Sequence, residues 1–320
     1  MSRWSPRELP HARRQSLNTL HAMWREIEEG RMETPPGSQP AEVAEFVGRH
    51  IALLMGCDMY WATPEMTALA VSAGRTLPEA CWADAYRPSV RGLMVWDGGA
   101  VQSGEHPAPV PRHMWPTTAY GTTKAPTVAV PYSAVSWAPH RDGVEITGWT
   151  SRHEMIRAFT AAGYPPDDPM RAPILAPARN AVLGADPVPQ DASELVGHQL
   201  EALLLTLAAA WQLMQQPTLA ERTVLRADRD DARRAARAGH SDPAVTIVDL
   251  RRLYHPQDPD ESPDGSLRTY SRRWVVSGHW RSQPFGKDRA QRRQQWIPSY
   301  IKGPDGAPLL ETERVNVWRR

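Results

Sequence analysis

The distribution of proline constrains the fold of this chain more than any other single feature. The 320 residues include 31 prolines. Proline lacks a backbone N–H and clashes with the preceding helical turn, so it ends helices and favours turns and extended connections. Long uninterrupted helices are therefore not expected. A hydrophobic fraction of 41% and a charged fraction of 23% still predict a globular protein with a buried core.

Three helices are predicted in the N-terminal part. Residues 7–29 carry apolar side chains near helical spacing, and a second helix runs from Ala41 to about Leu54. A third begins at Thr63-Pro64-Glu65, where threonine caps the helix, proline fits the first turn and the acid lies near the positive helix end. It ends near Gly74.

Short β-like runs separated by turn residues follow between about Val90 and Thr150. The last two of them flank Asp142-Gly143 and predict a hairpin. Residues 165–190 are rich in proline and are expected to be irregular. The predicted strands are residues 92–96, 127–130, 134–137 and 144–147.

The second half of the chain predicts one long core helix and three late strands. Asp191 to Glu194 has capping-box spacing, and the apolar stripe that follows ends before Pro217. The basic stretch from Arg226 to His240 reads as an exposed helix or a linker, in which aspartates and arginines form a salt-bridged helix face. The late strands are predicted at residues 245–250, 270–280 and 296–301.

Blocks of helices and two clusters of strands favour an α+β fold over an alternating doubly wound sheet. Three regions are expected along the chain. Residues 1–216 form a helical and β-rich body, residues 217–244 a basic helix or linker, and residues 245–320 a basic, Trp-rich β module.

Positive charge is concentrated at the C-terminal end. Residues 266–320 contain twelve Lys or Arg and four Asp or Glu, a net charge of +8, whereas the whole chain carries +1. The first 265 residues therefore carry −7. A basic, tryptophan-bearing end predicts contact with a polyanion, because arginine binds phosphates and aromatic rings stack on bases. The nucleic-acid-binding candidates are Arg273, Arg281, Lys287, Arg289, Arg292, Arg293, Trp296, Tyr300 and Lys302.

Two structural alternatives stay open for the same charges. An arginine-rich edge strand exposed to solvent discourages edge-to-edge association. The basic module could also dock onto the acidic body of the same chain.

Strand alternation through residues 272–281 would place Arg273, Ser277 and His279 on one face, opposite an apolar face. A histidine beside arginines is what a metal-independent ribonuclease would use for acid–base catalysis. The candidate catalytic residues are His279, Arg272, Arg281 and Lys302.

No cofactor and no metal site is predicted. The chain contains no phosphate loop, dinucleotide fingerprint, GxSxG or HExxH motif. Cys57 and Cys81 are expected to be buried free thiols. Neither a signal peptide nor an apolar stretch of membrane-spanning length is present, so the expectation is a cytoplasmic protein without membrane contact.

The pattern Gly278-His279-Trp280-Arg281, a basic loop, and Trp296-Ile297-x-x-Tyr300-Ile301-Lys302-Gly303 resembles the C-terminal module of a family of uncharacterised proteins from actinobacteria and their phages. It is also distantly similar to the C-terminal part of a type V anti-CRISPR family, which binds the nascent effector polypeptide and reduces the corresponding message. The resemblance implies a mobile-element or host-interaction context and supplies no catalytic residue.

The leading hypothesis is a regulatory or host–phage interaction protein, in which the body recognises a protein partner and the C-terminal module contacts RNA or DNA. One alternative is a toxin-like endoribonuclease that uses His279. Another is a protein-binding module whose exposed tryptophans anchor an interface.

Overall fold

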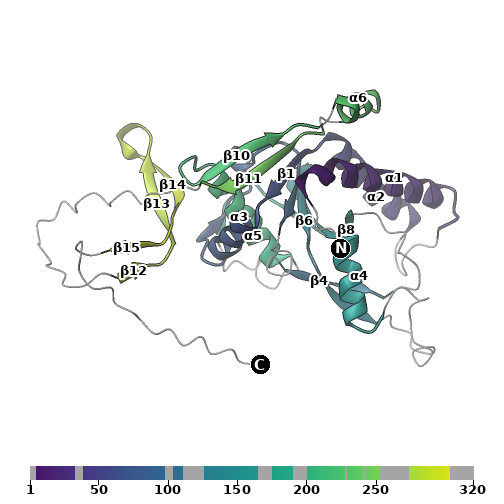
Figure 1. The fold of residues 1–320 in the computed structure, drawn as a ribbon, viewed down its shortest axis with the longest axis horizontal. Coiled ribbons are helices and arrows are strands. Elements are labelled where there is room, and N and C mark those ends of the chain that lie inside the picture. Colours follow the sequence, from purple (N-terminus) through teal and green to yellow (C-terminus); the bar gives the residue numbers. More distant parts are fainter. Residues whose placement is uncertain are drawn as a thin grey trace, which may run out of the picture. The chain divides into compact units, whose positions relative to one another are not determined.

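The computed structural model describes residues 5–32, 39–97, 104–110, 126–164, 175–189, 200–227, 229–240, 243–251 and 274–302, without the side chains of residues 274, 275, 301 and 302. The chain divides into two compact units, residues 1–251 and 252–320. The fold is α+β, with helices in blocks and one large mixed sheet (Figure 1).

A seven-stranded sheet forms the centre of the first unit, with strand order β10-β11-β1-β3-β6-β7-β8. The central strand β1 pairs in parallel with β11 and β3, and the remaining pairs are antiparallel. The strands are β1 (Asp58–Ala62), β3 (Gly92–Trp96), β6 (Ala134–His140), β7 (Gly143–Ser151), β8 (Leu175–Leu183), β10 (Ala220–Leu225) and β11 (Val245–Leu250).

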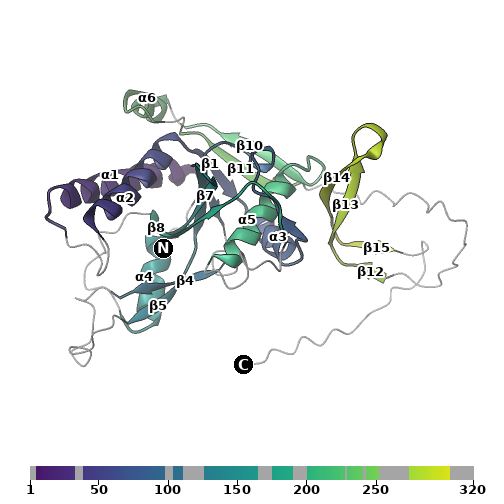
Figure 2. The ribbon, with the colours of Figure 1, turned by 180° about the vertical axis from the view of Figure 1, so that it is seen from behind.

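Helices cover both faces of this sheet, so the first unit has three layers (Figures 1 and 2). The helices α1 (Leu9–Glu28) and α2 (Pro40–Gly56) share a hydrophobic cluster with Met59 and Trp61 of β1. The helices α3 (Pro64–Gly74) and α5 (Glu201–Met214) pack together on the other face, where Trp211 of α5 contacts Trp137 of β6. Alternate residues of β1 thus face opposite helical layers, as the two-residue period of a strand requires.

The predicted N-terminal helices are confirmed, with boundaries close to those expected. Thr63 caps α3, its hydroxyl accepting a hydrogen bond from the Met66 N–H at 3.4 Å, and Pro64 occupies the first turn. The strand prediction at residues 92–96 is also confirmed. Both Cys57 and Cys81 are buried and free, and burial raises the pKa of the Cys57 thiol to about 11.

The core helix α5 is more deeply buried than an amphipathic stripe predicts. Every residue from Leu203 to Met214 is buried, because α3 and the sheet enclose the helix on several sides. The described helix begins at Glu201, and the capping box expected at residues 191–194 lies outside the described residues.

One prediction for the body was wrong. Part of the region expected to be irregular forms β8, which pairs with β7 at eight positions. A proline inside a strand suggests a loop from sequence alone, but prolines are tolerated on edge strands. Pro177 lies on this edge strand, opposite Trp149, where the register shifts.

The regional boundaries also differ from those predicted. β10 and β11 belong to the central sheet, so the first unit extends to Arg251 and the C-terminal unit does not begin at residue 245. The alternating pattern of residues 245–250 predicts a strand but not its partner, and β11 pairs with β1 nearly 190 residues away in sequence. Between β10 and β11 lies α6 (Arg229–Arg237), the basic helix that the sequence predicted.

The smaller elements complete the first unit. A hairpin of β4 and β5 packs with α4 around Phe159. Among the described residues, no helix has both the length and the apolar character needed to cross a membrane. These elements are η1 (Pro6–Glu8), β2 (Glu79–Ala80), η2 (Asp84–Tyr86), β4 (Glu105–Pro109), β5 (Thr127–Pro131), α4 (Arg152–Ala161) and β9 (Val188–Pro189).

The C-terminal unit contains two small antiparallel sheets. One is the pair β12 (Trp274–Val276) and β15 (Tyr300–Lys302), and the other is the hairpin of β13 (His279–Phe285) and β14 (Gln291–Ile297). The single strand predicted over residues 270–280 is interrupted at Ser277-Gly278, and residues 270–273 lie outside the described part.

Candidate nucleic-acid interface

The β13–β14 hairpin holds most of the predicted binding residues that the structure describes. Its strands pair from His279 opposite Ile297 to Phe285 opposite Gln291. Residues directly opposite each other in an antiparallel pair lie on the same face. This register therefore defines two faces, one with Trp280 and Trp296 and the other with His279 and Phe285.

The tryptophan face is the structural face of the hairpin. The rings of Trp280 and Trp296 meet edge to face with centroids 5.3 Å apart, and Trp296 is only 5% exposed. Gly278 lies against this pair, because a Cβ atom at Gly278 would come within 2.6 Å of the Trp296 ring. Trp296 is therefore a packing residue, and its predicted role as a stacking platform was wrong.

The opposite face is polar and basic. It carries Arg281 and Arg293 together with His279, Phe285 and four neighbours. The Arg293 guanidinium lies over the Phe285 ring, 5.5 Å from its centroid, and Phe285 remains 37% exposed. Phe285 is the aromatic group available on this face, although its sequence context gave no signal for that role. The neighbours are Gln283, Gln291, Gln295 and Ile297.

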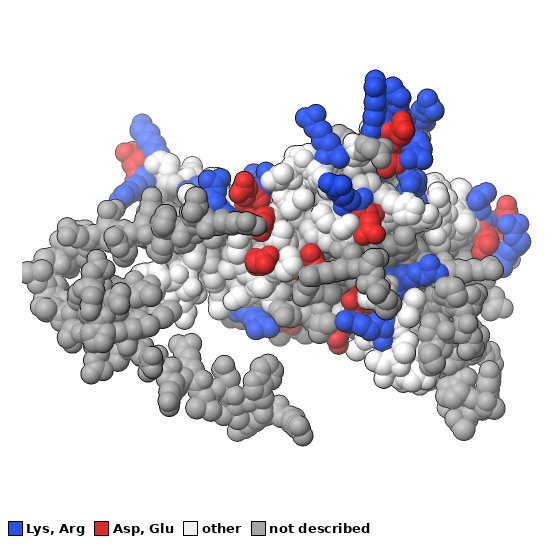
Figure 3. All heavy atoms as spheres, in the orientation of Figure 1, with Lys and Arg blue, Asp and Glu red and all other residues white. Residues whose placement is uncertain are grey.

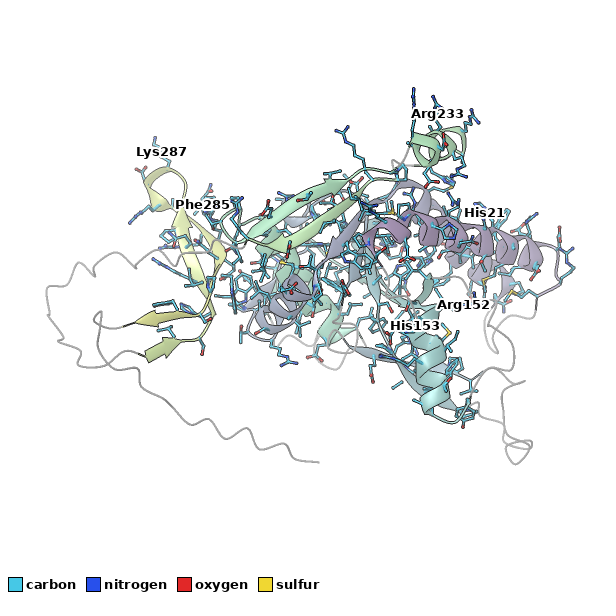
Figure 4. All side chains as sticks on the ribbon, viewed as in Figure 1. His21, Arg152, His153, Arg233, Phe285 and Lys287 are labelled. Carbon is cyan, nitrogen blue, oxygen red and sulfur yellow. The ribbon has the colours of Figure 1, made fainter. Side chains whose placement is uncertain are left out.

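Positive charge dominates the whole hairpin. Residues 279–297 contain five cations and one carboxylate, Asp288, a net charge of +4. All five cations are exposed, and none forms an ion pair within the described part of the C-terminal unit. Figure 4 shows Lys287 at the tip of the hairpin. The cations are Arg281, Lys287, Arg289, Arg292 and Arg293.

The loop that joins the strands has an unusual backbone. Asp288 and Arg289 have φ angles of 55° and 54°, next to Gly286 at 79°. Left-handed conformations are costly for residues with a Cβ, and aspartate tolerates them better than arginine. Arg289 therefore occupies a strained position where glycine would fit without cost. Such strain is retained where the side chain itself is useful.

Substitution of Arg289 by glycine is expected to change stability and binding in opposite directions. Glycine relieves the left-handed strain and should stabilise the hairpin by up to about 1 kcal/mol. The same change removes a cation and should weaken nucleic-acid binding about three-fold, on the order of one exposed ion pair. Hydrogen exchange of the backbone amides of residues 279–297 measures the first effect, and fluorescence anisotropy with a labelled oligonucleotide measures the second. Parallel losses in both would contradict this account.

The candidate catalytic group is not assembled by the described residues. The His279 ring lies on the exposed basic face, where its Nδ1–H donates to the Ser277 carbonyl oxygen at 3.1 Å. Arg281 lies two residues further along the same face. Arg272 and Arg273 lie outside the described residues, and Lys302 is described only by its backbone pairing with Trp274.

Two histidines of the first unit, His50 and His106, are buried in its core. The His50 Nε2 lies 3.2 Å from the Thr147 hydroxyl, and the His106 Nε2 lies 2.8 Å from the Thr150 hydroxyl. Burial lowers the pKa of both rings, so both are neutral core groups near neutral pH. In the described residues, no group of three or more His, Cys, Asp or Glu side chains could hold a metal ion.

Comparisons with known proteins assign neither a family nor a function to this chain. No protein-family model matches the chain, and no curated protein is similar to it.

Proposed function

We propose that the chain binds nucleic acid through the basic face and loop of the β13–β14 hairpin. The observation that carries this proposal is the charge of the hairpin. It contains five exposed cations and one carboxylate, and none of the cations forms an ion pair within the described C-terminal unit. Contact with phosphates explains the excess of one sign.

The chemistry of the basic face favours single strands over duplexes. Phe285 is 37% exposed and would stack on an unstacked base with the part of its ring that Arg293 does not cover, and Arg293 would supply a cation for a neighbouring phosphate. Gln283, Gln291 and Gln295 lie on the same face and bring amide groups that hydrogen-bond to bases, sugars or phosphates. A rigid duplex would leave Phe285 without a stacking partner.

Direct binding measurements test the proposal. Fluorescein-labelled single-stranded RNA, single-stranded DNA and duplex DNA of about 20 nucleotides are titrated with the full chain at about 50 mM salt, and anisotropy is recorded. Binding of single strands more tightly than the duplex is expected. Absence of binding to all three probes at this salt concentration would overturn the proposal.

The ribonuclease hypothesis makes a separate prediction. Metal-independent cleavage needs a pair of groups that take up and release protons, and His279 is the one side chain of that type on the described basic face. We therefore expect RNA to be recovered intact after incubation in chelator. The His279→Ala variant should bind with less than about a three-fold change in affinity, the size of one exposed contact. Gel electrophoresis of labelled RNA reads out cleavage, and cleavage that His279→Ala abolishes would establish the enzyme instead.

A regulatory or host–phage interaction role fits this arrangement, with the first unit recognising a protein partner and the hairpin contacting RNA or DNA. An affinity pulldown with bound nucleic acid sequenced in parallel distinguishes the alternatives. Recovery of a nuclease-sensitive complex supports this role. Stoichiometric recovery of one protein that nuclease does not disturb would favour a protein-binding module without nucleic acid.

A further inference from the structure

A second basic surface lies on the first unit, over α6. Figure 3 shows a group of Lys and Arg side chains there, with few acidic groups among them, and Figure 4 shows Arg233 directed away from the sheet. Arg229, Arg233 and Arg237 are spaced four residues apart, so they follow one face of the helix at intervals of about 6 Å. All three are exposed.

Of the two acidic residues of α6, Asp231 lies on the side opposite the three arginines, and Asp230 lies beside Arg233. Asp231 accepts hydrogen bonds from Arg14 of α1 at 3.1 Å and from Arg234 at 2.6 Å, which ties α6 to α1. The Arg14 guanidinium also holds the pKa of the Asp231 carboxyl below its ordinary value. Asp230 approaches Arg233 only at 3.9 Å. Arg229 and Arg237 form no ion pair with a described carboxylate.

A cavity of about 330 Å³ opens beside this helix. Arg7 and Arg226 line it together with Asp231, and the remaining lining residues are of apolar types. Arg14 and Arg234 already engage Asp231, whereas Arg7 and Arg226 form no ion pair with a carboxylate of the described residues. A pocket that combines apolar side chains with a few convergent polar groups is typical of a ligand site. The apolar lining residues are Pro6, Pro10, Leu225, Ala227, Pro243 and Val245.

We propose that α6 and this cavity form a second nucleic-acid site, in which Arg229, Arg233 and Arg237 contact successive phosphates of a single strand and the cavity receives one unstacked base. Arg7 and Arg226 at the cavity would hold the phosphates on either side of that base. The term α6 site is used below for these five arginines and the cavity. This site shares its class of ligand with the proposed function but uses no residue of the hairpin.

Two sites on one chain strengthen binding of a strand long enough to reach both. Once one site is occupied, the second binds at a high effective concentration, so the joint affinity exceeds that of either site. Short oligonucleotides that fill only one site would show no such gain. The α6 site would therefore set a minimum strand length for tight binding.

The first experiment measures binding of a labelled single strand of about 40 nucleotides to the full-length triple variant Arg229→Gln, Arg233→Gln and Arg237→Gln. The affinity is expected to fall about ten-fold, and the slope of log K against log salt should become shallower by about 2, the value for three lost phosphate contacts. The control is the triple variant Arg31→Gln, Arg141→Gln and Arg157→Gln, which removes the same charge from exposed sites elsewhere in the first unit. Equal losses in both variants would overturn the proposal.

The cavity is tested separately by filling it. Ala227→Trp leaves every charge in place and should weaken binding of the same strand several-fold while leaving binding of an abasic strand unchanged. Oligonucleotides carrying 4-thiouridine should crosslink to peptides that contain residues 6–10 or 225–245. Crosslinks confined to residues 279–297 would refute the α6 site and leave the hairpin proposal standing. Crosslinks confined to the α6 site would refute the hairpin proposal and leave the α6 site standing.

Discussion

Replacement of all five hairpin cations by glutamine is expected to lower the affinity for single-stranded nucleic acid by about 10³-fold at about 100 mM salt. Each exposed cation–phosphate contact is worth up to about 1 kcal/mol, and five contacts at about 0.8 kcal/mol each sum to about 4 kcal/mol. The variant carries Arg281→Gln, Lys287→Gln, Arg289→Gln, Arg292→Gln and Arg293→Gln. Anisotropy with a strand too short to reach a second site gives the cleanest measurement.

The hairpin should stay folded in this variant, because its packing depends on the tryptophan face, where Arg292 is the one substituted residue and lies opposite Pro284. Trp280 and Trp296 meet there, and the five substitutions leave both rings in place. A matched control removes five exposed arginines from the first unit and should change the affinity less than about three-fold. A comparable loss in the control would show that net charge, and not the hairpin, determines binding. The control positions are Arg25, Arg31, Arg75, Arg141 and Arg157.

Substitution of Gly92 by alanine is expected to cost the first unit about 3 kcal/mol of unfolding free energy. A Cβ atom at Gly92 would lie 2.1 Å from the ring of Trp137. That ring is fully buried between Tyr60 and Trp211, and its Nε1–H donates to the Ser89 carbonyl oxygen at 2.9 Å. The indole therefore has no space into which it can retreat without giving up these contacts.

The control for this prediction is Gly184→Ala. A Cβ atom at Gly184 meets nothing within 4 Å, so this substitution should change stability by less than about 0.5 kcal/mol. Urea denaturation followed by tryptophan fluorescence compares the two variants with the parent chain. If the midpoint for Gly92→Ala equals that for Gly184→Ala, the packing described around Trp137 is wrong.

The sequence predicted individual helices and strands better than it predicted which of them pair with one another. Thr63-Pro64 marks the start of α3 because capping is a local property of the chain. Residues 245–250 read correctly as a strand, yet their parallel pairing with β1 depends on a contact between distant parts of the sequence. Pro177 suggested a loop because sequence does not reveal which strand lies at an edge.

The candidate site was likewise predictable only in part. The charge of the hairpin follows from composition, so its cations were predictable from sequence. Which aromatic ring is exposed depends on the register, because a shift by one residue exchanges the two faces of a strand. The pairing of Trp280 with Trp296 buries the predicted platform and leaves Phe285 on the basic face. Similarly, the cavity beside α6 is lined by residues from both ends of the first unit's sequence and has no local signature.

The salt dependence of binding tests the central claim most directly. Log K for a single strand of about 20 nucleotides is plotted against log salt for the full chain and for the five-cation variant. The account predicts that the slope for the variant is shallower by about 3.5, because each phosphate contact of a single strand contributes about 0.7. Identical slopes for the two proteins would contradict the assignment of the hairpin as the nucleic-acid interface.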